Sequence, residues 1–241
     1  MKCIIPCAGY ATRLGEAGVH TPKSLIKIRG KFLIDHIIES LLDLDIDEFV
    51  VISNAKFYDQ FKEWFDNFSC KIKIRLINDG TTSNETRLGT LNDIKLALND
   101  FDDDFLVYFG DTFVNFDMKK ANEFFKEKKA PVMVLCDIGL ENAKRSAIIG
   151  LDENDRVTSI EEKPENPTFS LCSAGIYFCI QENKKDIEKY LEEGKNSEGI
   201  VYFLEDIMNK PLFGYVYDKE TNFYIDVGVP EAIDRANKID E

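Results

Sequence analysis

The sequence is short of histidine and of basic residues. Its 241 residues include only two His, and 30 Lys and Arg stand against 44 Asp and Glu, a formal net charge of −14. Two histidines are too few for a three-histidine zinc site, and neither has a nucleophile-elbow serine as a partner. The acidic balance argues against DNA, RNA or an anionic membrane surface as the main partner, because these recruit clustered basic residues. It leaves room for a small phosphorylated ligand, which a few well-placed cations can hold.

Long apolar runs and C-x-x-C pairs are also absent. No stretch approaches the ~20 apolar residues that span a bilayer, and the apolar run at the N-terminus is too short for a signal peptide. The six cysteines lie mostly in apolar runs. We therefore expect buried free thiols in a reducing cytoplasm, with a disulfide framework or a reactive or metal-binding role as the alternatives.

Up to residue 130 the chain alternates short β-branched runs with longer amphipathic ones. Apolar residues at the 3.6-residue period predict the helices, and buried or alternating runs predict the strands. The predicted strands are 2–7, 48–53, 71–77 and 104–109, and the predicted helices are 32–42, 57–68, 88–98 and 118–128. This order favours a mainly parallel sheet covered by helices.

Beyond residue 130 strands dominate. The predicted strands are 132–137, 147–151, 157–161, 171–180, 212–217 and 222–226, and the predicted helices are 182–193, 199–209 and 230–239. No linker or internal repeat separates the two parts. We therefore expect one α/β domain over residues 1–241, in which the second half (131–241) elaborates the sheet of the first (1–130).

Residues suited to phosphates and metals follow the predicted strands, where open α/β sheets bind their ligands. The first strand leads into Ala8-Gly9-Tyr10-Ala11-Thr12-Arg13, where glycine lets backbone N–H groups approach a phosphate. A tight structural turn explains this loop about as well, since it matches neither the Walker motif nor the dinucleotide fingerprint. Lys23 follows on a segment stiffened by Pro22, and a solvent-facing lysine is the alternative there.

Two carboxylates also end strands. Asp111 follows the apolar run 105–109 and a glycine, and Asp226 ends a similar run near the C-terminus. Such carboxylates suit a divalent ion, with turn capping as the alternative for Asp111. Lys163, in a charged turn, is a second candidate phosphate ligand. Together these groups suit phosphoryl transfer.

This combination resembles the sugar-phosphate nucleotidylyltransferases, also called nucleotide-sugar pyrophosphorylases, of the glucose-1-phosphate thymidylyltransferase kind. The likeness covers nearly the whole chain. It rests on five short motifs in the family's order: Ala8-Gly9-x-x-Thr12-Arg13-Leu14, Pro22-Lys23, Gly110-Asp111, Glu162-Lys163-Pro164 and Asp226-x-Gly228. It implies a Rossmann-like nucleotidyltransferase fold with a mixed, mainly parallel central sheet, helices on both faces, and a smaller β-rich acceptor-binding portion.

The resemblance also implies roles for single residues. Arg13 and Lys23 are the expected catalytic residues, on the β- and γ-phosphates and on the α-phosphate and leaving pyrophosphate respectively. Asp111 and Asp226 are expected to bind Mg²⁺. The implied nucleotide-binding residues, in the half 1–130, are Ala8, Gly9, Tyr10, Ala11, Thr12, Gly89, Asn92 and Gly110. The implied acceptor-binding residues, in the half 131–241, are Glu162, Lys163 and Gly175. A helix-surface position is the alternative for Asn92.

The implied reaction transfers a nucleoside monophosphate from a triphosphate, a pyrimidine one by resemblance, to a sugar 1-phosphate for cell-surface glycan synthesis. The acceptor oxygen is already anionic at neutral pH, so the scarcity of histidine is no obstacle. The stretch Ser146-Ala147-Ile148-Ile149-Gly150 and the loop Gly9-Tyr10-Ala11 depart from the family pattern. They keep open a cytidylyltransferase acting on a non-sugar phosphate monoester, phosphocholine- or phosphoglutamine-like.

Two other classes remain as alternatives. A non-catalytic nucleotide-binding regulatory subunit is disfavoured because Arg13, Lys23, Asp111 and Asp226 are all present. A glycosyltransferase of related fold needs an Asp-x-Asp motif, and 102–104 precedes its strand and would lie at the wrong end of the sheet. The expected partners are a nucleoside triphosphate and a phosphate monoester, with no nucleic acid or membrane, and the protein is expected to be a monomer or small homo-oligomer.

Overall fold

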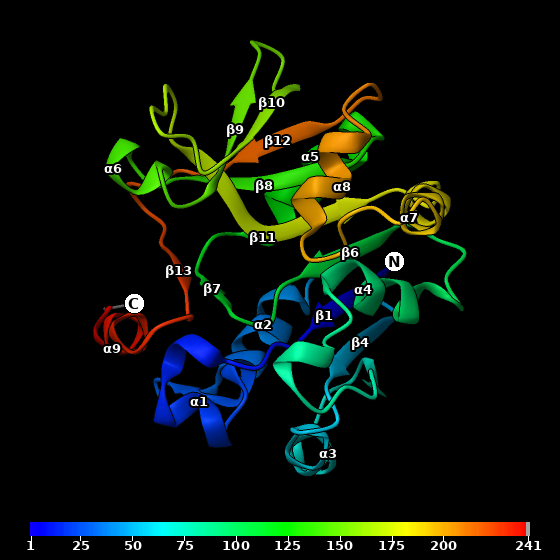
Figure 1. Cartoon of the computed structure of the whole chain (residues 1–241), viewed down its shortest axis with the longest axis vertical. Helices are drawn as coiled ribbons and strands as arrows, with labels where there is room; N and C mark the ends of the chain where they lie inside the picture. The colour runs from blue at the N-terminus through cyan, green and yellow to red at the C-terminus, as the bar shows by residue number, and fades with distance from the viewer. Residues whose placement is uncertain (240–241) are drawn as a thin grey trace.

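The computed structural model describes residues 1–239, apart from the side chains of residues 16 and 17. A nine-stranded sheet runs through the molecule in the order β10-β9-β11-β6-β1-β4-β5, with β8 paired to β11 and β12 paired to β8 (Figure 1). Its strands are β1 (Lys2–Pro6), β4 (Glu48–Ser53), β5 (Lys73–Asn78), β6 (Phe105–Tyr108), β8 (Val132–Asp137), β9 (Ala147–Leu151), β10 (Val157–Glu162), β11 (Leu171–Cys179) and β12 (Phe213–Val216).

Helices and two small sheets complete the described chain. The helices are α1 (Glu16–His20), α2 (Leu33–Leu41), α3 (Tyr58–Asn67), α4 (Thr90–Leu98), α5 (Met118–Lys128), α6 (Leu140–Ala143), α7 (Asn183–Glu192), α8 (Ile200–Asp206) and α9 (Pro230–Lys238). The small sheets pair β2 (Lys27–Ile28) with β3 (Lys31–Phe32), and β7 (Thr112–Val114) with β13 (Tyr224–Asp226).

The sheet is mixed. Strands β6, β1, β4 and β5 run parallel to their neighbours in this group. Strand β11 runs antiparallel to β6, β8 and β9, so the second half of the chain extends the sheet of the first. The predicted α/β class, with a mainly parallel centre and a β-rich second portion, is confirmed.

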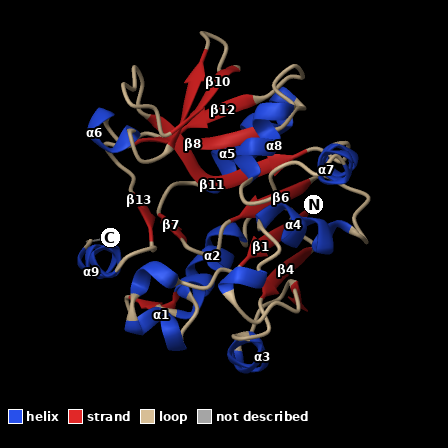
Figure 2. Cartoon of the chain, in the orientation of Figure 1, coloured by secondary structure: helices blue, strands red, loops and turns tan. Residues whose placement is uncertain are grey.

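Helices cover both faces of the sheet, as predicted (Figure 2). Successive side chains of a strand point to opposite faces. In β1 the fully buried Ile4 joins a core that includes Leu91 of α4, together with α7 and α8. Its neighbours Cys3 and Ile5 join the core on the other face, which includes Ile34 of α2, together with α3, α5 and α9.

The elements missing from the sequence prediction are all short. They include α1, α6, β2, β3 and β7, of two to five residues each. Two or three residues cannot display a period, and β7 exists because β13 pairs with it from far along the chain. The acidic stretch 102–104 does precede β6, at the amino end of the strand, as expected.

The cysteines are free, and five of the six are buried. The Sγ atoms of Cys136 and Cys172, on neighbouring strands β8 and β11, lie 3.3 Å apart as thiols. No helix among residues 1–239 is both long enough and apolar enough to cross a membrane.

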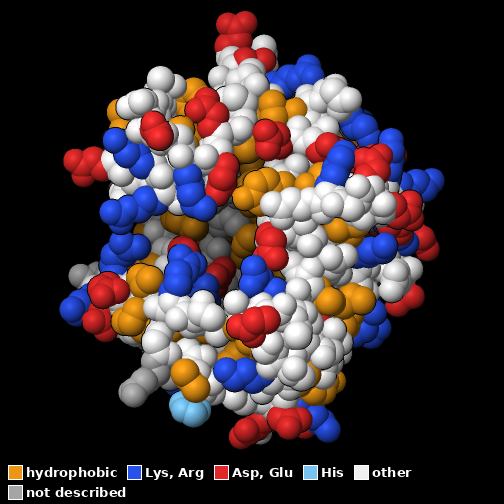
Figure 3. All heavy atoms as spheres, in the orientation of Figure 1, with side chains coloured by type: hydrophobic (Ala, Val, Ile, Leu, Met, Phe, Trp, Pro, Cys, Tyr) orange, Lys and Arg blue, Asp and Glu red, His pale blue; other side chains and the backbone are white. Residues whose placement is uncertain are grey.

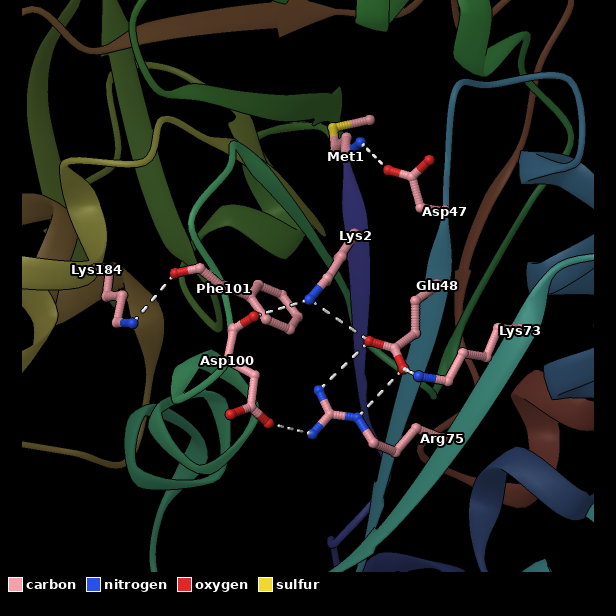
Figure 4. Close-up of polar contacts among 9 residues, drawn as sticks. All are labelled: Met1, Lys2, Asp47, Glu48, Lys73, Arg75, Asp100, Phe101 and Lys184. Carbon is pink, nitrogen blue, oxygen red and sulfur yellow. Dashed lines mark hydrogen bonds and ion pairs between the residues drawn. The ribbon is translucent and has the colours of Figure 1, made fainter.

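An ion-pair cluster ties the strands together at the amino ends of β1 and β4 (Figure 4). The buried carboxylate of Glu48 lies 2.7 Å from Lys73 Nζ, 3.4 Å from Arg75 Nε and 3.7 Å from Lys2 Nζ. Burial alone would raise the pKa of Glu48, but the hydrogen bond from Lys73 and these cationic charges outweigh it and lower the pKa. This cluster lies at the amino ends of the parallel strands, whereas the predicted site residues follow their carboxyl ends.

Candidate active site

Two cavities open at the carboxyl ends of the parallel strands, and they meet at Phe109 and Asp111, which line both. The smaller, of about 190 Å³, is lined by residues that follow β1 and β6, with Lys23 and the first turns of α4. The larger, of about 880 Å³, lies between β11, β7, β13, α6 and α9. Figure 3 shows this face hollowed at its centre, with basic side chains around the hollow. We call them the loop cavity and the large cavity.

The small β7–β13 sheet brings Asp111 and Asp226 together. Asp226 pairs with Thr112 across the two strands, and the backbone N–H of Val227 donates to the carbonyl of Asp111 at 2.8 Å. Burial raises the pKa of Asp226, and the nearby charge of Asp111 raises it further against the opposing charges of Lys23 and Arg13. Two carboxylates from distant parts of the chain therefore share one site.

These residues fit a divalent ion. Asp226 Oδ1 is buried and has no hydrogen-bond partner among the described residues, which leaves a strong acceptor unused. No group of three or more His, Cys, Asp or Glu in the described residues could hold a metal. Mg²⁺ is usually bound by one or two carboxylates together with substrate phosphates, so a pair of carboxylates is the donor set it needs.

Two cations stand beside the carboxylates. Lys23 Nζ donates to Asp111 Oδ2 at 2.6 Å and is mostly buried. Arg13 Nη2 lies 3.7 Å from Asp226 Oδ2, and its side chain is 63% exposed. Lys23 lines the loop cavity and Arg13 the large one, so each cavity has a cation of its own next to the carboxylate pair.

Glycines at this site allow close packing at two positions and leave open space at a third. A Cβ on Gly110 would lie 2.4 Å from Cys7 Sγ and 2.5 Å from Ser24 Oγ, and one on Gly228 would lie 2.9 Å from Asp226 Oδ1. By contrast, a Cβ on Gly9 would meet nothing within 4 Å. Gly110 and Gly228 are therefore required by close packing, whereas the space before Gly9 is open to a ligand.

The structure brings together many of the predicted site residues. Those lining the loop cavity are Ala8, Gly9, Lys23, Gly110 and Asp111. Those lining the large cavity are Arg13, Asp111, Gly175 and Asp226. Gly175 has a φ of +74°, which favours glycine, and its carbonyl accepts from the N–H of Phe109.

Other predicted residues line neither cavity. Tyr10, Ala11 and Thr12 belong to the first loop: the Tyr10 hydroxyl lies 2.7 Å from Thr81 Oγ1, and the Ala11 carbonyl accepts from Leu14 at the turn that includes Thr12. Gly89 packs against Ser197 at the start of α4.

The remaining predicted residues pair within their own segments. Asn92 donates from Nδ2 to the carbonyl of Leu88 at 2.8 Å. Glu162 and Lys163 form an ion pair with each other at 2.9 Å, and the Lys163 side chain is 63% exposed. Neither residue of this pair lines the large cavity.

The large cavity has charged residues that the sequence did not single out. Asp137, at the end of β8, forms an ion pair with Lys219 and accepts from Ser170, and these hydrogen bonds lower its pKa to about 2. Arg235 lines the same cavity from α9. The strand-end rule that indicated Asp111 applies equally to Asp137, whereas no sequence signal marked Lys219 or Arg235.

The loop cavity also contains an unexpected acid. Asp93 lines it from α4 and is only 7% exposed. Its position four residues before the buried Ala97, on the inner stripe of the helix, is a signal that the sequence does carry. An acid on an apolar stripe indicates either a partner or a ligand.

Strand-end loops, a carboxylate pair and flanking cations thus come together at one end of the sheet of this α/β domain. A family model described as "Nucleotidyl transferase" matches residues 2–241, and the chain belongs to this family. The resemblance to sugar-phosphate nucleotidylyltransferases is thereby confirmed at the level of the family.

Two relatives and one solved structure show the extent of the similarity. The chain is 31% identical to the bifunctional protein GlmU of Methanocaldococcus jannaschii, over 99% of this chain and 54% of that protein. It is 30% identical to the bifunctional sugar-1-phosphate nucleotidylyltransferase/acetyltransferase of Sulfurisphaera tokodaii, over 99% of this chain and 55% of that protein. The chain thus spans about half the length of these curated relatives. A UDP-glucose pyrophosphorylase in complex with UDP-glucose shares the fold, with a TM-score of 0.83 at 16% identity over 98% of this chain and 96% of that one.

Proposed function

We propose that this protein is a Mg²⁺-dependent nucleotidylyltransferase. It transfers a nucleoside monophosphate from a pyrimidine nucleoside triphosphate to a sugar 1-phosphate and releases pyrophosphate, in the cytoplasm, for cell-surface glycan synthesis. The observation that carries the proposal is that two cavities share Asp111, with Asp226, Lys23 and Arg13 beside it. One cavity takes the triphosphate and the other the phosphorylated acceptor.

The chemistry needs alignment and charge neutralisation rather than a base. A phosphate oxygen of the acceptor attacks the α-phosphorus, the bond to the β-phosphate breaks, and pyrophosphate leaves with the electron pair. Lys23 holds the α-phosphate and the departing pyrophosphate from the loop cavity, and Arg13 faces the same charge from the large cavity. Asp111 and Asp226 would hold Mg²⁺, which would supply further neutralisation of the phosphate charge.

Support for a sugar 1-phosphate comes from the named activity of a relative that shares 30% identity. The size of the large cavity and its charged wall of Asp137, Lys219 and Arg235 also suit a polar acceptor. The protein acts as a monomer or small homo-oligomer in this proposal.

The test is pyrophosphate release, with Mg²⁺, across a matrix of nucleoside triphosphates and phosphate monoesters. The acceptors include hexose 1-phosphates, an amino-sugar 1-phosphate and phosphocholine. Release with a sugar 1-phosphate and its loss with EDTA are expected. Binding of triphosphates without release from any pair would instead support a regulatory subunit and overturn the proposal.

A further inference from the structure

The loop cavity contains a carboxylate without a partner. Asp93 lines this cavity together with Gly9 and Thr90, and its Oδ1 is buried with no hydrogen-bond partner among the described residues. Burial, with a smaller contribution from the charge of Asp79, raises the pKa of Asp93 to about 7. A buried acid left in this condition costs stability that no described protein group offsets. The residue that carries this unused acceptor lines a cavity that a ligand can enter.

The neighbouring acid is in a different condition. Asp79, in the loop after β5, accepts from the N–H of Thr81 at 2.7 Å and from its hydroxyl at 2.8 Å. The hydroxyl of Tyr10 completes this chain of contacts at 2.7 Å from Thr81 Oγ1. Asp79 does not line the loop cavity. Of these two neighbouring acids, Asp93 is the one available to a ligand.

Asp93 reaches the loop cavity from α4, a different element from those that position Lys23 and Asp111. Asp111 follows β6 and Gly9 follows β1, whereas Asp79, the acid near Asp93, follows β5 at the far edge. A carboxylate repels phosphate, so a triphosphate held at Lys23 and Asp111 would leave the Asp93 side of the cavity to its nucleoside.

We propose that Asp93 reads the base of the nucleoside triphosphate and selects a base with an exocyclic amino group, which among pyrimidines is cytosine. This inference rests on the proposed function and narrows its donor substrate to CTP. An ionised carboxylate only accepts hydrogen bonds. Cytosine presents an amino donor at N4, where uracil and thymine present the O4 acceptor. With the 4-position of the base at Asp93, uracil loses this hydrogen bond and sets two acceptors against each other.

The selectivity should be large because the carboxylate is buried. A site built to accept from an N–H group penalises an analogue without it by about 10² or more. An amide at this position has both an acceptor and a donor, so it can serve O4 as well as N4. Asp93→Asn therefore tests the reading of the base with little change in shape.

The experiment measures the affinity of the full chain for CTP, dCTP, UTP, dTTP, ATP and GTP by isothermal titration at pH 8.5 with Mg²⁺ and no acceptor. The wild type is expected to bind CTP at least ~10²-fold more tightly than UTP. Asp93→Asn is expected to reduce this ratio at least tenfold, and Asp93→Ala provides a second variant should the first not fold. Asp79→Asn, the matched control next to it, should leave the ratio unchanged.

Each other outcome has a separate meaning. An equal loss of affinity for every nucleotide in Asp93→Asn would indicate a contact to the ribose or a structural role, and would overturn the inference. So would a wild type that binds UTP as tightly as CTP, with the proposed function intact. A preference for ATP or GTP that Asp93→Asn abolishes supports amino-group reading and overturns only the pyrimidine part of the proposed function. Binding of no triphosphate overturns both.

Discussion

Asp226 Oδ1 and Asp93 Oδ1 are both buried acceptors without hydrogen-bond partners in residues 1–239. One lies beside Asp111 and the other in the loop cavity. Folded chains satisfy most of their buried polar atoms, and in the proposed function bound ligands supply the partners of these two.

The carboxylate pair gives the first prediction. Asp111→Asn and Asp226→Asn should each reduce kcat by on the order of 10²–10³ or more, because each removes charge where phosphate charge must be neutralised. Circular dichroism and thermal unfolding should show the fold intact. Asp102→Asn is the control, since this exposed acid precedes β6 at the opposite end of the strand. Full activity in both site variants would refute the metal assignment.

The raised pKa of Asp93 predicts a dependence of stability on pH. With a pKa of about 7 when folded and about 4 when unfolded, the folded protein binds more protons between these values. The free energy of unfolding should therefore fall as the pH rises from 5 to 7.5, by roughly 2–4 kcal/mol from this group, and level off above that. Asp79 and Tyr10 lie near Asp93 and are present in both the wild type and Asp93→Asn, so the comparison of these two proteins isolates Asp93.

Urea unfolding at pH 5.0, 6.0, 7.0 and 8.0 checks this dependence in the ligand-free protein. Asp93→Asn should show a shallower slope than the wild type and greater stability at pH 8. Parallel curves for the two proteins would show that the Asp93 carboxyl is solvated in the folded state.

Among single residues, the sequence could predict those that end strands or carry loop motifs. Asp111, Asp226, Gly9 and Lys23 all lie at the cavities. Gly9 and Asp111 do so because they follow β1 and β6, whose carboxyl ends meet at one end of the parallel sheet. The partners of Lys163 and Asn92 could not be predicted. Both contacts depend on side-chain geometry: Lys163 pairs with the adjacent Glu162, and Asn92 donates to the carbonyl of Leu88, four residues earlier.

At the scale of elements, long periodic segments were predictable and short ones were not. Helix α5 and strands β4 and β8 have the predicted bounds, since α5 repeats its buried positions with the helical period and both strands contain unbroken apolar runs. Strand β7 is three residues long and depends on β13 for its hydrogen bonds. Its existence follows from the tertiary structure and leaves no local pattern in the sequence.

The loops that leave β1 and β6 give an element-scale prediction from two glycines. Gly110→Ala should destabilise the protein by roughly 1–3 kcal/mol, because its Cβ would overlap Cys7 and Ser24. Gly9→Ala should leave stability within about 0.5 kcal/mol but weaken triphosphate binding, since its Cβ would enter the open space of the loop cavity. Urea unfolding and nucleotide titration on both variants separate the effects. If Gly9→Ala binds nucleotide as tightly as the wild type, the phosphates do not bind next to Gly9.

On the scale of the whole molecule, the charge of −14 acts on stability as well as on the choice of partners. A large net charge repels itself in the compact state, and exposed ion pairs compensate little. Raising NaCl from 50 to 500 mM at pH 8 should therefore raise the free energy of unfolding by about 1 kcal/mol. Urea titrations at the two salt concentrations measure this change in the free energy of unfolding. The control is pH 4.7, near the isoelectric point of the sequence, where the effect of salt should be smaller. A decrease at pH 8 would show that surface ion pairs outweigh the repulsion.

The pairing of β7 with β13 has a consequence for the protein while it is being made. Asp111 leaves the ribosome long before Asp226, and the carboxylate pair cannot form until residues 224–226 have emerged and found β7. A nascent chain, or one ended early by a nonsense codon, would have the loop after β1 without the second carboxylate. Under the proposed function, such a fragment is expected to be inactive, because the metal site would have only one of its two carboxylates.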